Sequence, residues 1–184
     1  VEEALATNPD AKVLAFVHAE TSTGARSDAE SLCALAQKFG CLTIVDAVTA
    51  LAGIELRVDD WGIDAIYSGT QKCLSCVPGL SPVSFSPRAV DVIKARKTKV
   101  QSWFLDLNLV MGYWGSDAKR SYHHTAPINS LYALHEALVI VKEEGLENSW
   151  QRHALNHRAF AAGIEALGLS FVVTEEYRLP QLNA

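Results

Sequence analysis

Short apolar runs alternate along the chain with segments of helical period. Three apolar runs predict buried strands, at residues 12–19, 41–47 and 64–69. The segment between the first two has apolar side chains at helical spacing, with Ser27 or Asp28 as its N-cap and Gly40 as its C-cap. The order strand, helix, strand, strand predicts an α/β fold with a mainly parallel sheet between helices.

The second half of the chain becomes helical after one more strand. The segment that joins Lys72 to the run at 82–86 is too short for a helical crossover, so this strand should run antiparallel to its neighbour. Four helices are expected after it, at residues 87–97, 103–112, 127–143 and 146–167. The sheet is therefore expected to be mixed at one edge.

Composition narrows the class of protein. Among 184 residues, 16 basic and 21 acidic side chains give a net charge of −5, which argues against a general nucleic-acid surface. No apolar run approaches the ~20 residues that span a bilayer, so no membrane association is expected. Four cysteines are too few for a disulfide scaffold in a chain of this length, which favours reduced thiols in the cytoplasm.

Two chemically active side chains follow neighbouring apolar runs. Asp46 comes at the end of the second run, and Lys72 follows the third. The carboxyl ends of parallel strands meet at one edge of a sheet, where ligands bind. A partly desolvated lysine can form a Schiff base with a carbonyl, and an aspartate can hold a pyridinium nitrogen protonated. The pair is a candidate pyridoxal phosphate (PLP) site; the alternative is two ordinary solvated residues.

Longer motifs favour the first reading. They are "HAETSTG", "IVDAVTALAG", "YSGTQKCLSCVPGLSPVSFS", "GYWGSDAKRSYHHTAPINSLYALHEAL" and "EEGLENSWQRH". Together, in this order and spacing, they resemble the alanine:glyoxylate and serine:pyruvate aminotransferase group, class V aminotransferases of PLP fold type I. The likeness covers nearly the whole chain.

The resemblance implies a role for five residues. Lys72 would carry the cofactor as a Schiff base, and Asp46 would pair with the pyridine nitrogen. Val48 would press against one face of the ring, Thr21 would lie near the ring substituents, and Gln71 would reach the phosphate. The implied reaction moves an amino group from a small amino acid, alanine or serine, to a 2-oxo acid, glyoxylate or pyruvate.

The resemblance also implies a homodimer with shared active sites. Tyr122 and Thr125 of "YHHT" match positions that bind the phosphate of the neighbouring subunit's cofactor, and hydroxyls suit that task. Taken alone, the segment could equally be a helix-capping loop, because Thr125 is a plausible N-cap before Pro127.

The same resemblance predicts that the sequence is a fragment. Residues 1–167 would be part of the large PLP-binding domain, and residues 168–184 would begin a truncated small domain. The alternatives are a fragment without catalytic activity and another class V enzyme such as a cysteine desulfurase. Members of the resembling group work in cytosol, peroxisomes or mitochondria.

Metal and redox sites are disfavoured. The C-x-x-C at Cys73 and Cys76 has no second such pair to complete a zinc site. His153 and His157 are four residues apart on a predicted helix but lack the H-E-x-x-H pattern, so a polar helix face is the better interpretation. We therefore expect no metal ligands.

Overall fold

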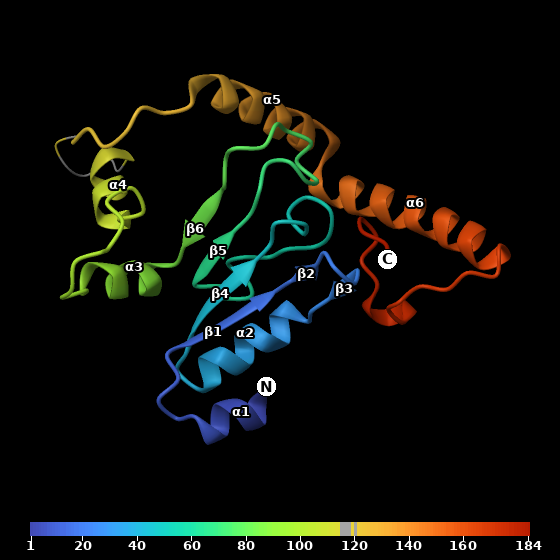
Figure 1. The fold of residues 1–184 in the computed structure, drawn as a ribbon, viewed down its shortest axis with the longest axis horizontal. Helices are drawn as coiled ribbons and strands as arrows, with labels where there is room; N and C mark the ends of the chain where they lie inside the picture. The colour runs from blue at the N-terminus through green and yellow to red at the C-terminus, as the bar shows by residue number, and fades with distance from the viewer. Residues whose placement is uncertain (115–118, 120) are drawn as a thin grey trace.

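A mixed four-stranded sheet forms the centre of the computed structural model, which describes residues 1–114, 119 and 121–184 (Figure 1). Its strands, in spatial order, are β1 (Val13–Val17), β4 (Leu42–Asp46), β5 (Ala65–Tyr67) and β6 (Val83–Phe85). β1, β4 and β5 are parallel, and β6 pairs antiparallel with β5. The predicted mainly parallel sheet with an antiparallel last strand is confirmed.

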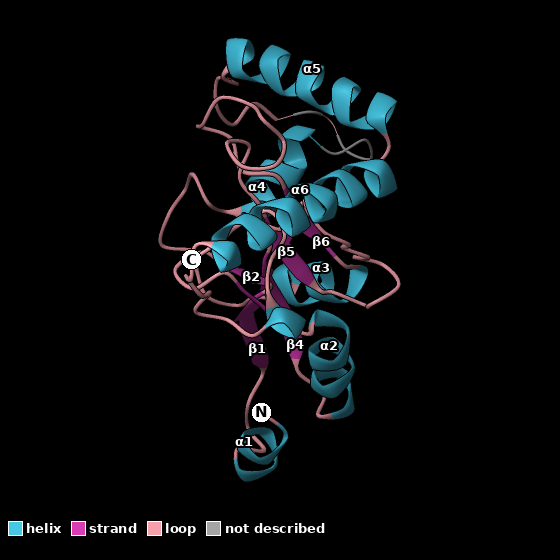
Figure 2. Ribbon diagram, turned by 90° about the vertical axis from the view of Figure 1, so that its right-hand side faces the viewer, coloured by secondary structure: helices cyan, strands magenta, loops and turns pink. Residues whose placement is uncertain are grey.

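The described part of the chain also contains six helices, a short hairpin and one 3-10 turn, of which α2 lies alongside the sheet (Figures 1 and 2). The helices are α1 (Glu2–Thr7), α2 (Ala29–Lys38), α3 (Pro87–Lys94), α4 (Leu107–Trp114), α5 (Ile128–Glu144) and α6 (Leu146–Ala166). The hairpin consists of β2 (Ala19–Glu20) and β3 (Ala25–Arg26), and the 3-10 turn is η1 (Glu175–Tyr177). No described helix has both the length and the apolar character needed to cross a membrane.

Local capping sets the ends of α2. The Asp28 carboxylate accepts a hydrogen bond from the Ser31 backbone N–H at 3.1 Å, which satisfies a free donor of the first turn. At the other end the C-cap is Phe39, one residue before the predicted Gly40, and Gly40 adopts a φ of +70°, a left-handed conformation that glycine adopts without strain. Of the two predicted N-caps, Asp28 is therefore the one used.

Helix α4 begins at Leu107, four residues later than the sequence pattern predicts. The apolar residues from Trp103 continue a helical pattern, yet the helix begins at Leu107. The carboxylate of Asp106 accepts a hydrogen bond from the Asn108 backbone N–H at 3.0 Å, which starts the helix there. The preceding turn is held separately by the Ser102 hydroxyl, which accepts from the Leu105 N–H at 3.3 Å.

The two faces of the sheet differ in burial. Val45 and Ile66, paired across β4 and β5, belong to a buried core that also contains Cys33 of α2. On the opposite face, β4 and β5 present Ile44 and Tyr67, each 39% exposed. The alternation follows from the two-residue period of a strand. The parallel strands therefore direct one set of side chains into the core and the other set outward.

The last residues of the chain pack back onto the hairpin. Leu179 is fully buried in the main core, and its N–H donates to the Gly24 carbonyl at 2.9 Å. Arg178 forms an isolated antiparallel bridge with Ala25. The division of the chain after residue 167 into two domains stays a prediction.

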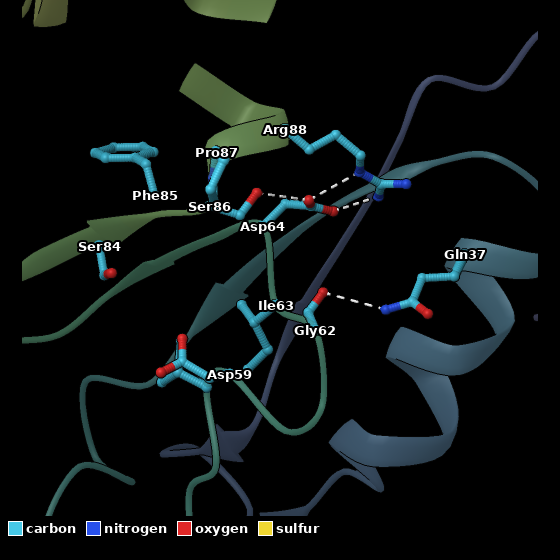
Figure 3. A pocket seen from close by; sticks show the side chains of 11 residues that line it. Gln37, Asp59, Gly62, Ile63, Asp64, Ser84, Phe85, Ser86, Pro87 and Arg88 are labelled. Atoms are coloured by element: carbon cyan, nitrogen blue, oxygen red, sulfur yellow. Dashed lines mark hydrogen bonds and ion pairs between the residues drawn. The ribbon is translucent and has the colours of Figure 1, made fainter. Parts of the chain in front are cut away.

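A buried carboxylate fixes the edge of the sheet at which β5 begins. Asp64 accepts hydrogen bonds from the Ser86 hydroxyl at 2.9 Å and from two nitrogens of Arg88 at 2.9 and 2.5 Å (Figure 3). It also accepts one from the Thr43 N–H at 3.0 Å. Burial alone would raise the pKa of Asp64, but these donors, Arg88 first, hold the pKa below its ordinary value. One side chain thereby joins β4 to the N-terminus of α3 at the start of β5.

We expect Asp64→Asn to lower the free energy of unfolding of the full-length protein by about 1.5–3 kcal/mol, because hydrogen bonds to a charged acceptor are lost. The matched control is Asp59→Asn, which removes an exposed carboxylate from the rim of the same pocket. Since the folded-state pKa is lowered, the stabilisation is present above the unfolded pKa of about 3.9 and is lost as pH falls through the folded value. Urea titrations at neutral and acidic pH measure this; equal effects of both variants at neutral pH would contradict it.

Candidate active site

Asp46 ends β4 with its carboxylate held by two donors. The Val48 backbone N–H donates to Oδ1 at 2.9 Å, and the Tyr67 hydroxyl donates to Oδ2 at 2.7 Å. The parallel register pairs Asp46 with Tyr67, so both side chains stand on the same face of the sheet. The carboxylate is half-buried at the carboxyl edge of β4, as the sequence predicted for Asp46.

Lys72 lies in a loop that follows β5. Thr70, fully buried, closes this loop by donating its hydroxyl to the Val77 carbonyl at 2.6 Å and accepting the Cys76 N–H on its own carbonyl at 3.0 Å. The Ser75 N–H adds a bond to the Lys72 carbonyl at 2.9 Å. The Lys72 side chain is exposed and makes no hydrogen bond or ion pair with another described residue. Its backbone is fixed while its amine is left available.

The small hydroxyl residues before Lys72 have a structural task. Ser68 is buried and donates its hydroxyl to the Ala47 carbonyl at 3.0 Å, which ties the start of the Lys72 loop to the loop after Asp46. The Thr70 hydroxyl is used within its own loop. Neither group is free to contact a ligand in this arrangement.

The loop after Asp46 is anchored from three sides. The Thr49 hydroxyl donates to the Ala19 carbonyl at 2.8 Å, and the Thr49 carbonyl accepts from Gln181 Nε2 at 2.8 Å. The buried Ser149 of α6 donates to the carbonyl of Ala52 at 2.8 Å, where the backbone has a φ of 69°. These bonds hold half-buried Val48 in place beside Asp46.

Thr21 and Gln71 are both exposed. Thr21 lies in the turn between β2 and β3, which follows β1, and Gln71 directly precedes Lys72. Their side chains make no hydrogen bond with another described residue. Because β1, β4 and β5 are parallel, the loops that carry these residues leave the sheet at the same edge as Asp46. The structure thus gathers five of the seven predicted site residues on the loops and strand ends of one edge.

Tyr122 and Thr125 lie elsewhere, beside α4. Both side chains are exposed, and their hydroxyl oxygens are 2.7 Å apart, so one donates to the other. The Tyr122 ring also meets Tyr113 edge to face, with ring centroids 5.6 Å apart. No described contact joins this pair to Asp46 or Lys72.

The intervening histidines anchor the Tyr122–Thr125 segment. The His123 ring stacks on Trp103 at 4.0 Å, and its Nε2 donates to the Trp103 carbonyl at 3.0 Å. A neutral His123 then has an acceptor at Nδ1, which lies 2.7 Å from Nδ1 of His124. The two rings bond each other, and no cluster of three or more His, Cys, Asp or Glu is found among the described residues.

Tyr67 was missed by the sequence reasoning. Its hydroxyl donates a hydrogen bond to Asp46. This bond, and to a smaller extent burial, raises the pKa of the Tyr67 phenol. The sequence contains one signal for Tyr67: it is the last apolar residue of the predicted strand before "SGT", as Asp46 comes at the end of the preceding predicted strand. Its role becomes visible only once the structure shows that Tyr67 is the direct partner of Asp46 across β5 and β4.

A strand edge that carries a hydrogen-bonded carboxylate and an accessible amine is typical of an α/β enzyme site. The chain belongs to the aminotransferase class-V family, whose model matches residues 1–181. It is 42% identical over 185 residues to an alanine–glyoxylate aminotransferase from Oryctolagus cuniculus, covering 100% of this chain and 47% of that protein. It is 37% identical to a (S)-ureidoglycine–glyoxylate transaminase from Bacillus subtilis, over 92% of this chain and 44% of that protein.

A solved structure supports the fold directly. The crystal structure of an alanine–glyoxylate aminotransferase from Nostoc sp. superposes with a TM-score of 0.93 at 50% identity, covering 97% of this chain and 47% of that chain. The chain therefore spans about half the length of the relatives it matches. The predicted family, fold class and fragment are confirmed.

Close packing between the two loops predicts the effect of a small substitution. A Cβ at position 53 would lie 2.6 Å from the Cys73 sulfur, so Gly53→Ala should displace the residue next to Lys72 and destabilise the full-length protein by about 1–3 kcal/mol. Adding Cys73→Ala removes the nearest obstructing atom, while Gln181 Cγ at 3.0 Å remains, and should recover about 1 kcal/mol of this loss. Urea unfolding of the two single variants and the double variant measures the coupling; strictly additive effects would rule out the contact.

Proposed function

We propose that the full-length protein is a PLP-dependent aminotransferase that moves an amino group from a small amino acid, alanine or serine, to glyoxylate or pyruvate. The observation that carries this proposal is the placement of Asp46 and Lys72 after adjacent parallel strands of a class V aminotransferase fold. Two relatives named for glyoxylate favour that acceptor.

The residues present fit PLP in the chemistry of their donors and acceptors. Asp46 offers a carboxylate, already oriented by two donors, to a protonated ring nitrogen. Lys72 offers an exposed amine that no described residue occupies. Gln71 and Thr21 add exposed polar groups without partners among the described residues, and Val48 adds an apolar surface. PLP, when bound, supplies an electron sink for the amino acid's α-carbon.

The chain's own residues then have separate tasks. Lys72 would bind the cofactor's carbonyl carbon through Nζ until the substrate's amino group displaces it. The freed amine would then take the proton from the substrate α-carbon as general base and deliver it, as general acid, to the carbon that Lys72 had held. Asp46 would accept a hydrogen bond from the ring nitrogen, Val48 would limit ring movement, Thr21 would lie near the ring substituents and Gln71 would donate to the phosphate.

We further propose a homodimer in which Tyr122 and Thr125 bind the phosphate of the neighbouring subunit's cofactor. Their exposed hydroxyls lie beside α4 and make no described contact with Asp46 or Lys72, which is the expected arrangement for residues that act on another subunit. The 2.7 Å bond between them leaves one hydroxyl hydrogen of the pair for an external acceptor.

The alternatives from the sequence are another class V enzyme, such as a cysteine desulfurase, and a fragment without activity. The two relatives above, at 42% and 37% identity, carry aminotransferase names, which favours amino transfer. The four free cysteines suit a reducing compartment such as the cytoplasm. Peroxisomes and mitochondria remain the alternative locations.

Substituting the nucleophile tests the chemistry. In the full-length protein, Lys72→Arg should abolish both the visible absorption band of lysine-bound PLP and transaminase turnover, because a guanidinium stays protonated and cannot condense with an aldehyde. Lys97→Arg is the control, since Lys97 is exposed after α3 and makes no hydrogen bond with another described residue. Ordinary turnover in the Lys72 variant would exclude this residue as the Schiff-base lysine.

Subunit exchange tests the shared site. Each of two parents, Tyr122→Phe with Thr125→Ala and Asp46→Asn, should have low activity alone. Mixed dimers place both lesions in one site and leave the other site whole, so activity should rise towards about a quarter of wild type after random pairing. The measurement is transaminase activity after exchange demonstrated by a tag on one parent. Exchange without recovery would place Tyr122 and Thr125 in their own subunit's site or outside the site.

A further inference from the structure

The orientation of the Asp46 carboxylate is only partly fixed by its own loop. The carboxylate stands at the end of β4, half-buried, and its only restraint from its own loop is the Val48 N–H, which donates to Oδ1 at 2.9 Å. A carboxylate held at one oxygen by one donor can still tilt about that bond. An acceptor for a planar ring nitrogen has to keep the second oxygen fixed as well.

Tyr67 supplies the second restraint from a different strand. Its hydroxyl donates to Oδ2 at 2.7 Å, while the parallel register holds Asp46 and Tyr67 as direct partners. The backbone reinforces this pairing, because the Ala47 N–H donates to the Tyr67 carbonyl at 2.9 Å. Both carboxylate oxygens therefore accept a hydrogen bond, one from Val48 and one from Tyr67, and the pairing of β4 with β5 fixes the positions of these donors.

The tyrosine does not belong to the described hydrophobic core. Its side chain lies on the outward face of the sheet and is 39% exposed, whereas its neighbour Ile66 is the residue that enters the core. The hydroxyl makes no other hydrogen bond among the described residues. A phenylalanine would fill the same place, so the phenol oxygen points to a task at Asp46.

We propose that Tyr67 is a positioning residue, which holds the Asp46 carboxylate so that a free lone pair of this group meets the ring nitrogen of the cofactor. An ionised carboxylate has about four acceptor positions on its two oxygens, of which Val48 and Tyr67 occupy one each. The remaining positions accept the ring N–H without breaking either bond. This inference rests on the proposed function, because it assumes that Asp46 receives a pyridine-type nitrogen.

The first test needs no cofactor. In the full-length apoprotein, NMR titration with isotope-labelled tyrosine should find one phenol whose pKa lies above the ordinary value of about 10, as the bond to Asp46 raises it. Asp46→Asn should return this resonance towards the ordinary value, and Tyr67→Phe should remove it. A full set of tyrosines that is unmoved by Asp46→Asn would overturn the inference.

The second test measures cofactor binding. Tyr67→Phe should raise the dissociation constant for PLP by about tenfold. Losing a partner that orients a metal ligand costs about this much affinity, and Tyr67 would orient Asp46 in the same way. The control Tyr177→Phe removes another exposed phenol whose side chain has no hydrogen bond among the described residues, and should leave binding unchanged. Equal affinities for both variants would overturn the inference.

A double-variant cycle separates positioning from a general structural effect. The loss caused by Tyr67→Phe should be present with Asp46 and absent when Asp46→Asn has already removed the acceptor. The same loss in both backgrounds would show that Tyr67 acts on the fold and would overturn the proposal.

These results are distinguishable from a failure of the proposed function. If wild-type protein does not bind PLP, or Lys72→Arg retains turnover, the proposed function fails. If wild type binds PLP through Lys72 and only the Tyr67 variants behave as their controls, the positioning role alone fails.

Discussion

The parallel register between β4 and β5 is the constraint on which the candidate site depends. It pairs Asp46 with Tyr67 at the last position of both strands, so a carboxylate and a phenol stand on one face. Beyond this pair, the Ser68 hydroxyl donates to the Ala47 carbonyl at 3.0 Å and keeps the two following loops together. A slip of one residue would turn Asp46 towards the core face and separate its carboxylate from Lys72's loop.

Much of the fold could be predicted because local physics determines it. Continuous apolar runs gave the strands, and Asp28 and Gly40 at the ends of α2 are caps that work within one or two turns of their own helix. The predicted start of α4 is four residues too early because a local cap was overlooked. The apolar pattern extends back to Trp103, but Asp106 is the residue whose side chain accepts a hydrogen bond at the helix start. Periodicity records burial, whereas helix ends are set by hydrogen bonding.

The candidate site was only partly predictable, for a related reason. Asp46 and Lys72 could be found from their places after apolar runs. The bond from Tyr67 to Asp46 depends on strand register, and the contact that leaves no room for a side chain at Gly53 depends on two loops that meet in space. The roles of Ser68 and Thr70 were also hidden, since a hydroxyl before a lysine looks the same whether it binds a ligand or a carbonyl of its own loop. Long-range pairing decides such cases, and residue type does not.

The polar groups at the two ends of β5 are arranged in opposite ways. Where β5 begins, the buried Asp64 carboxylate meets donors from Thr43, Ser86 and Arg88, so the burial of its charge is compensated within the described chain. In the loop after β5, Lys72 remains exposed without a described partner, while Asp46, at the end of the adjacent strand β4, is held at both oxygens. In the proposed function Lys72 is the nucleophile, which has to move to meet a carbonyl, and Asp46 is the acceptor, which works best when it is already in place. The hydrogen bonds at this edge follow that division: they fix the acceptor and the backbone under the lysine, and they leave the amine free.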